Sequence, residues 1–459
     1  MIRWHLYRRS DGPPLGRVWS RWISVGPELE LPSRSSLLVV GPTQVGKTSG
    51  IVVPALLRWS GPVVVTSVKR DVLDVTGRWR SSQGRVVVLD PSSDEGLTWD
   101  PLEGVSTLRQ ALALARDLVI TSRERSSSES DFWNSLAVKV LAAVMVATLQ
   151  RGGSIFDVVA TIEQRDFFAL RSTELSSDVD RILSSAERME PRTLDSVCST
   201  IDAMLLPWQI RQPLARVTTL LDGNNTLYLC APRTDHRHYE GLFRGVVRTL
   251  LDEQQRRAHG EAPPRLLVLL DEAASIAPLD DLDQLAATVS GMNVTLLTVF
   301  QDFAQIRTRW GERAATIVNN HTTRVVMAGL VDSSLAEFLP PALRPSAESP
   351  HEASEEIRQL PKNVGVLISG QFPRTLVRFR PWFRQRLLRT RSGAPDVTTM
   401  QGWSTTTPPN LAGLPIPAPS LTAFATRTPF TSPPADTGSS LDTPMHWPSC
   451  DTKGPPRTP

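Results

Sequence analysis

One octapeptide constrains the fold of this chain more than any other feature: Gly41-Pro42-Thr43-Gln44-Val45-Gly46-Lys47-Thr48. It fits GxxxxGK(S/T), the Walker A pattern, in which glycines let a loop curl so that backbone N–H groups converge on phosphate oxygens. The loop follows the apolar run Leu37–Val40 and precedes the apolar stretch Ile51–Leu57. This is the required strand–loop–helix context, because the helix N-terminus adds the positive end of its dipole. The alternative is a glycine turn that fits by chance, and this context favours a nucleotide site.

The residue types within the loop predict individual roles. We expect all eight residues, Gly41 to Thr48, to line the phosphates of ATP. Lys47 is expected to reach the β- and γ-phosphates and to act in catalysis, while the Thr48 hydroxyl is expected to ligate Mg²⁺.

A second motif lies in RLLVLLDEAA, where Asp271 and Glu272 end the apolar run Leu266–Leu270. This is the Walker B arrangement. Asp271 is expected to hold the metal shell, and Glu272 to polarise the attacking water as the catalytic base. Acidic pairs at strand ends also serve as N-caps of the following helix. The Walker A motif upstream favours the catalytic interpretation.

Gln301 lies thirty residues beyond Asp271 and ends another apolar run, Val294–Phe300. A polar amide at that place can bond the γ-phosphate or the attacking water and report hydrolysis to the next element. The other interpretation is a surface glutamine that opens a loop. Spacing alone does not separate the two.

The wider pattern predicts a doubly wound α/β sheet, because short buried apolar runs alternate with longer amphipathic stretches. The expected strands are 36–40, 62–68, 85–90, 226–230, 265–271, 294–300, 323–329 and 364–370.

Between 106 and 215 the strand pattern is absent and apolar residues fall at helical spacing. One helix is expected to start at Asp131, as N-cap, and another to open at Pro191. After Arg391 the composition changes: the last 68 residues hold 14 of the 37 prolines and few periodic apolar positions, which predicts disorder. The expected organisation is an N-terminal segment 1–34, a nucleotide-binding domain 35–105 and 216–391, an inserted all-helical domain 106–215, and a disordered Pro/Thr/Ser-rich tail 392–459.

Composition excludes several classes of protein. The three cysteines are widely spaced, which argues against a disulfide framework or a zinc site. The best apolar run, Leu136–Leu149, has 14 residues and contains Lys139, whereas a bilayer span needs about 18. We expect a buried helix there and no transmembrane segment in the chain. A net charge of +3 does not by itself indicate a polyanionic partner.

Residues 374–391 form a basic segment with seven arginines and the interleaved aromatics Phe379, Trp382 and Phe383. Such a mixture can follow phosphates and stack on bases. The alternative, an edge strand with a solvated basic face and a charged linker, agrees better with the nearly balanced overall charge.

With these motifs in order, the sequence resembles the TraG/TraD-type coupling proteins of conjugative type IV secretion, relatives of the RecA and FtsK motors. The matching stretches include LLVVGPTQVGKTSGIVVPALL, SDFWNSLAVKVL, LLDEAASIAPL and LLTVFQDFAQIRTRWG, and they cover most of residues 35–380. The resemblance implies a RecA-like P-loop sheet with an inserted helical domain, and it implies that Gln301 is a catalytic sensor. It also implies a hexameric ATPase that delivers DNA, single-stranded or relaxase-bound, to type IV secretion channel components. The expected location is cytoplasmic, at the inner face of the plasma membrane, through a membrane-protein partner.

Two departures from the family pattern keep other functions open. The chain lacks the N-terminal transmembrane helices of most members, and the interval from Ala273 to Phe300 holds no arginine or lysine that could act across a subunit interface. Arg307 and Arg309 are candidates for that role, although surface arginines on a polar helix are the simpler interpretation. The alternatives are an FtsK-like DNA translocase not tied to secretion, and a nucleotide-gated receptor that docks secreted effectors.

Overall fold

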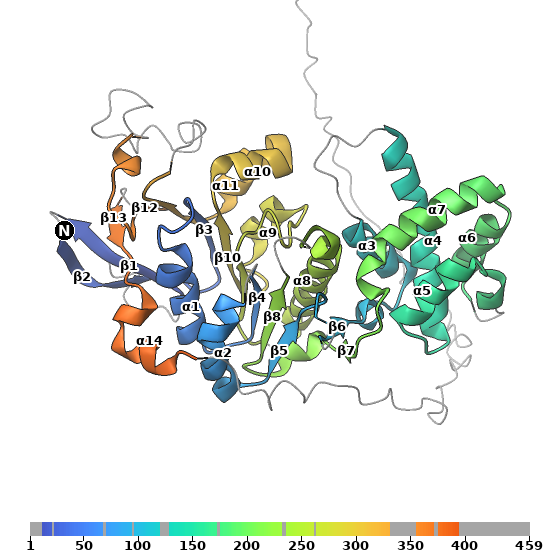
Figure 1. Ribbon diagram of the computed structural model, residues 1–459, viewed down its shortest axis with the longest axis horizontal. Helices are drawn as coiled ribbons and strands as arrows, with labels where there is room; N and C mark the ends of the chain where they lie inside the picture. Colours follow the sequence, from blue (N-terminus) through green and yellow to red (C-terminus); the bar gives the residue numbers. More distant parts are fainter. Residues whose placement is uncertain are drawn as a thin grey trace, which may run out of the picture. The chain divides into compact units, whose positions relative to one another are not determined.

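One sheet of eleven strands organises the residues that the computed structural model describes, which are 12–20, 23–67, 70–93, 96–119, 128–171, 175–231, 236–260, 263–330, 355–370 and 375–393. The strand order is β2-β1-β13-β12-β11-β3-β10-β9-β4-β8-β5 (Figure 1). The strands are β1 Pro14–Ser20, β2 Ile23–Glu30, β3 Ser36–Val40, β4 Val63–Ser67, β5 Val86–Leu89, β8 Thr226–Cys230, β9 Leu266–Leu270, β10 Val294–Phe300, β11 Thr323–Met327, β12 Val364–Ser369 and β13 Thr375–Arg378. The expected tail, 394–459, lies outside the described residues.

From β11 through β3 to β5, each strand is parallel to the next one in the sheet. They are buried on both faces, which explains their continuous apolar runs. Successive residues alternate between two cores, so that Leu38 and Val40 face one core while Leu37 and Val39 face the other. The predicted α/β class is confirmed, and the carboxyl ends of these strands meet at one edge.

Helices cover both faces of the sheet (Figure 1). The core that contains Leu37 and Val39 also holds residues of α1 and α2, and the other core holds residues of α8 to α11. Their bounds are α1 Val53–Arg58, α2 Asp71–Gln83, α8 His236–Ala258, α9 Leu282–Thr288, α10 Phe303–Trp310 and α11 Ala314–Asn320.

The other wing of the sheet is antiparallel and differs from the sequence-based prediction. β12 pairs antiparallel with β11, β13 with β12, β1 with β13, and β2 with β1. The expected direction of 364–370, parallel like the other strands, was therefore wrong. A buried antiparallel strand has the same apolar run as a parallel one, so the sequence pattern could not distinguish them. The pair β1 and β2 also extends the sheet, although the sequence pattern assigns 1–34 to a segment outside the nucleotide-binding domain.

Among the described residues, five α-helices lie between β6 (Thr98–Trp99) and β7 (Leu214–Ala215), which pair with each other in a separate small sheet. α4 packs against α3, α6 and α7. Asp131 lies inside α4 instead of capping it, because the helix begins at Ser128. The window Asp131–Gln150 is long and apolar enough to cross a membrane by length and composition alone, and 61% of it is buried in the protein. The bounds are α3 Leu108–Leu118, α4 Ser128–Gln150, α5 Ile155–Gln164, α6 Ser177–Glu187 and α7 Pro191–Met204.

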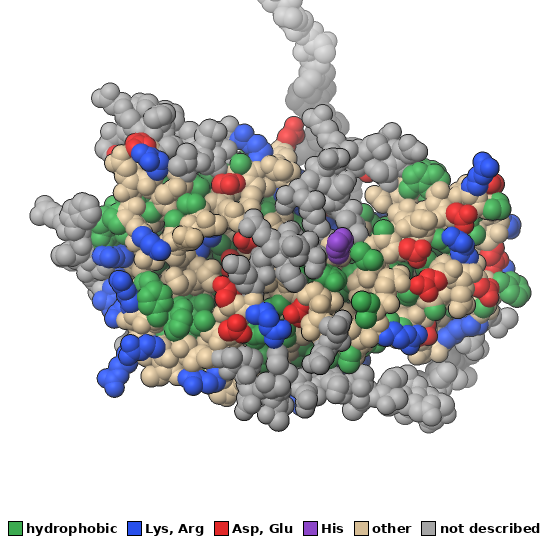
Figure 2. All heavy atoms as spheres, viewed as in Figure 1, with side chains coloured by type: hydrophobic (Ala, Val, Ile, Leu, Met, Phe, Trp, Pro, Cys, Tyr) green, Lys and Arg blue, Asp and Glu red, His purple; other side chains and the backbone are tan. Residues whose placement is uncertain are grey.

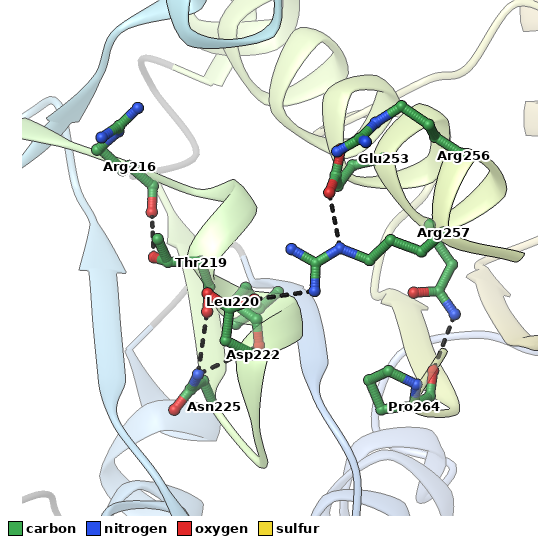
Figure 3. Close-up of polar contacts among 10 residues, drawn as sticks. Arg216, Thr219, Leu220, Asp222, Asn225, Glu253, Arg256, Arg257 and Pro264 are labelled. Carbon is green, nitrogen blue, oxygen red and sulfur yellow. Dashed lines mark hydrogen bonds and ion pairs between the residues drawn. The ribbon is translucent and has the colours of Figure 1, made fainter. Parts of the chain in front are cut away.

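Polar contacts at the end of α8 fix the entry to two central strands (Figure 3). Arg257 pairs with Glu253 on its own helix and with Asp222 in the turn before β8, at 2.6 and 2.8 Å. The Asn225 amide donates to the Thr219 and Leu220 carbonyls. Gln254 donates to the Pro264 carbonyl, two residues before β9. β9 carries the Walker B residues, so these contacts help to position the site.

Candidate nucleotide site

The Walker A loop connects the end of β3 to a helical segment that begins at Thr48, as one π-helical turn (Thr48–Val52) leading into α1. The Gly41 N–H donates to the Phe300 carbonyl at 3.2 Å, which ties the loop to the neighbouring strand β10. Gln44 and Gly46 have φ values of 65° and 103°. This left-handed backbone curls the loop, and it explains the glycine at position 46.

Close packing also restricts the loop glycines. A Cβ on Gly46 would lie 2.0 Å from Asn363 Oδ1, and a Cβ on Gly41 would lie 2.5 Å from the Met327 Cβ. The Asn363 N–H donates to the Val45 carbonyl at 3.1 Å. Asn363 therefore packs against the loop, although it lies more than 300 residues later in the sequence. The sequence analysis missed this residue, because no local pattern marks a contact between residues more than 300 positions apart.

Lys47 lies against its own loop and near three carboxylates. Its ammonium group donates to the Gly41 carbonyl and, at 2.9 Å, to the Pro42 carbonyl. Burial lowers the pKa of Lys47, while the charges of Asp271, Glu272 and Asp302 oppose that shift. The structure thus brings the Walker A lysine and the Walker B pair together.

Asp271 and Glu272 follow β9, between the ends of β10 and β4. The Asp271 carbonyl accepts a hydrogen bond from Thr66 Oγ1 at 3.1 Å. Burial, with the charge of Glu272, raises the pKa of the Asp271 carboxyl to about 7, and Lys47 opposes the rise. Glu272 has a φ of 57°, a left-handed conformation that non-glycine residues adopt mostly where the surroundings impose it. The strand therefore ends in a sharp turn that directs the two carboxylates differently.

Gln301 follows β10, the strand between β3 and β9. Its side-chain amide donates to Glu272 Oε1 at 3.0 Å, and its backbone N–H donates to Gln305 Oε1 at 3.0 Å. The interpretation of Gln301 as a free surface residue does not describe this arrangement. The carboxyl ends of three adjacent strands thus bring Lys47, Glu272 and Gln301 together.

The donor set suits Mg²⁺. That ion is usually held by one or two carboxylates together with substrate phosphates and water. Asp271 supplies a carboxylate, and Thr48, at the start of the helical segment, supplies a hydroxyl. No group of three or more His, Cys, Asp or Glu side chains suited to a metal occurs in the part of the chain that the structure covers. A dedicated all-protein metal cage is thus absent from that part.

The two arginines after Gln301 differ in their surroundings. Arg309 forms a buried ion pair with Glu240 of α8, with only 8% and 7% of the side chains exposed. The interpretation of Arg309 as a surface residue was therefore wrong: this pair joins α10 to α8. Arg307 is exposed. Of the basic segment, residues 375–391 are described, and β13 lies between β12 and β1 and is not an edge strand.

Comparisons with known proteins agree with this geometry. Residues 20–340 match the family described as type IV secretory system conjugative DNA transfer. The chain is 25% identical to the protein VirD4 of Rhizobium radiobacter over an alignment of 356 positions, and the match covers 72% of this chain and 51% of that protein. Two structures of the plasmid coupling protein TrwB have a similar fold. The complex with the non-hydrolysable ATP analogue ADPNP has a TM-score of 0.59 at 15% identity, and the match covers 82% of this chain and 91% of that one. The complex with ADP and Mg²⁺ has a TM-score of 0.58 at 15% identity, and the match covers 80% and 89%. The chain spans about half the length of the VirD4 protein that it matches.

Proposed function

This chain belongs to the type IV secretory system conjugative DNA transfer family, and from that premise we propose that it is a Mg²⁺-dependent ATPase that delivers DNA, or a protein–DNA conjugate, to a secretion channel. The observation that carries the proposal is the convergence of Lys47, Asp271, Glu272 and Gln301 beside a Walker A loop. The nucleotide and the metal in the TrwB complexes support the assignment of ATP and Mg²⁺.

The chain's own residues have distinct tasks in this mechanism. Lys47 exchanges the Gly41 and Pro42 carbonyls for β- and γ-phosphate oxygens, and backbone N–H groups of residues 43–48 hold the remaining oxygens. Thr48 and Asp271 would hold Mg²⁺, and the bound ion would neutralise charge that develops on the phosphates. Glu272 accepts a proton from the attacking water, and the Gln301 amide, which donates to that carboxylate, can turn to the γ-phosphate and release it.

The partners follow from the family. The substrate is DNA, single-stranded or bound to a relaxase, and the receiving side is made of type IV secretion channel components. The active form is a homo-hexamer on the cytoplasmic side of the plasma membrane, held there with a membrane-protein partner. A neighbouring subunit supplies a cation to the γ-phosphate, as is common among P-loop motors.

One observation favours a second candidate function. The sequence from Ala273 to Phe300 holds no arginine or lysine, and Arg309 is neutralised within its own subunit. Loss of a trans-acting arginine can slow hydrolysis by three to five orders of magnitude. A nucleotide-gated receptor for secreted effectors would tolerate such slow turnover.

An ATPase assay of the full chain, with and without single- and double-stranded DNA, tests the proposal. DNA-stimulated turnover that disappears in Lys47→Ala supports the motor. ATP-dependent binding of an effector with negligible turnover, in the presence of DNA, supports the receptor instead. Turnover that persists in Lys47→Ala would contradict both.

A further inference from the structure

The chain carries a mixed basic and apolar surface that the proposed nucleotide site does not use. We call it the α14 face, and it consists of Arg380, Phe383, Arg384, Arg386, Leu387 and Arg389. All six side chains are exposed, with exposed fractions of 47% for Phe383 and 59% for Leu387. Figure 2 shows Lys and Arg side chains gathered around hydrophobic ones where Figure 1 draws α14 (Arg386–Arg391).

Buried contacts with α1 fix the backbone beneath the α14 face. Leu388 is 1% exposed and packs with Val53 and Leu57 of α1. Arg391 donates to the Leu57 carbonyl at 2.7 Å, and its guanidinium lies 3.9 Å from the centre of the Trp79 ring. Leu387 and Arg389 therefore stay outward because their neighbours in sequence are fixed inward.

Charge in this region is one-sided. The sequence from Ile357 to Pro395 contains no aspartate or glutamate. Glu28, which lies close to α1, is already paired with Arg58 at 2.8 Å. None of the arginines of the α14 face makes an ion pair within the described part of the chain. A surface of this kind attracts an extended array of negative charges.

The apolar residues of the α14 face indicate which kind of negatively charged surface it binds. Leu387 has no π-face and cannot stack on a nucleic-acid base, and the Phe383 ring lies nearly perpendicular to the Trp382 ring, with ring centres 5.7 Å apart, so the two rings do not form one flat stacking surface. Both side chains can enter the boundary between headgroups and acyl chains while arginines stay at the phosphates. We propose that the α14 face docks on an anionic phospholipid surface. This goes beyond the nucleotide site and does not depend on ATP hydrolysis.

Sedimentation of the full chain with lipid vesicles tests the proposal. We expect binding to vesicles of phosphatidylcholine with phosphatidylglycerol, weak binding to phosphatidylcholine alone, and a decrease of binding with salt. Arg386→Glu/Arg389→Glu should weaken binding to the anionic vesicles about tenfold or more, because each arginine near the surface contributes attraction. Leu387→Ser should weaken it several-fold without changing charge.

Matched controls lie among the inserted residues 106–215, away from α14. Arg188→Glu/Arg192→Glu changes charge equally at exposed positions, and Ile210→Ser removes a side chain that is 65% exposed. Both should bind vesicles as the unchanged protein does. If the double α14 variant fails to fold, as judged by its melting temperature, Leu387→Ser and the salt dependence decide. Equal binding to both vesicle types, or unchanged binding of the α14 variants, would overturn the proposal. Loss of DNA binding with unchanged vesicle binding would assign the face to nucleic acid instead.

Discussion

The Gln301 amide donates to the Glu272 carboxylate across 3.0 Å, joining the ends of two adjacent strands. Glu272 is therefore held by a group that can also reach a phosphate. If Gln301 turns toward the nucleotide, the carboxylate becomes free to accept a proton from water. This one contact relates the state of the nucleotide to the orientation of the base.

Glu272→Gln should retain ATP binding and lower the hydrolysis rate about a hundredfold or more, because the general base is lost while the phosphate contacts remain. Titration with a fluorescent ATP analogue and a phosphate-release assay measure the two effects separately. Lys47→Ala is the comparison, since it should lose binding itself. Normal turnover in Glu272→Gln would refute the Walker B assignment.

Gln301→Ala should abolish stimulation of the ATPase by DNA but leave assembly intact, because the amide contacts Glu272 within its own subunit. Sedimentation velocity and DNA-dependent ATPase rates measure the two outcomes. Gln284→Ala is the control, because it removes another side-chain amide, on α9. Loss of assembly in Gln301→Ala would mean that the residue forms an interface.

Assembly itself should be visible in the kinetics. A subunit that needs a cation from its neighbour is nearly inactive when dilute, so specific activity should rise with protein concentration in the presence of ATP and DNA. Mass photometry of the same samples should find a hexamer. A constant specific activity, with full turnover in a monomer, would contradict this model.

Asn363→Gly should raise the KM for ATP about tenfold with little change in kcat, because it removes the side chain that backs Gly46 while a glycine keeps the left-handed φ of 62°. Steady-state kinetics measure the split. Asn293→Gly is a matched control, since Asn293 also has a positive φ, 55°, and lies at the start of β10. Equal effects of the two variants would indicate a general loss of stability.

His321 should contribute a loss of stability as pH falls below about 6.5, opposite in sign to the contribution of Asp271, whose pKa is raised. This ring is buried between Thr298 Oγ1, at 3.0 Å, and the Ile317 carbonyl, at 2.7 Å. Burial lowers its pKa to about 4, so between pH 6.5 and 4 the unfolded chain binds a proton that the folded chain does not. The contribution of His321 to the free energy of unfolding is fully present above the pKa of the unfolded chain, and about 2 kcal/mol of it is lost by pH 5. Urea unfolding of the protein and of His321→Asn at several pH values should find this slope reduced in the variant. An equal slope in both would assign the pH dependence to other groups.

Much of this molecule follows from local pattern. The Walker A loop, the parallel strands and the family were predicted correctly, because each depends on a few residues that are close in sequence. The direction of β12 and the inclusion of β1 in the sheet were not, since pairing partners are chosen by contacts distant in sequence. The burial of Arg309 depends on Glu240, which lies 69 positions away. The roles of Thr48, Asp271, Glu272 and Gln301 stay predictions that the variants above test.

The backing of the phosphate loop by Asn363 and Phe379 affects how the protein is made. A Cβ on Gly50 would lie 3.0 Å from the Phe379 Cβ, and the Phe379 N–H donates to the Asn363 carbonyl at 2.8 Å. The loop leaves the ribosome early, but these residues follow about 330 positions later, roughly 20 to 70 s at ordinary rates of bacterial synthesis. In the last part of that interval, after Gln301 has been made, the nascent chain carries every nucleotide motif without the support that fixes the loop. Nucleotide binding should therefore begin only after Phe379 has left the ribosome.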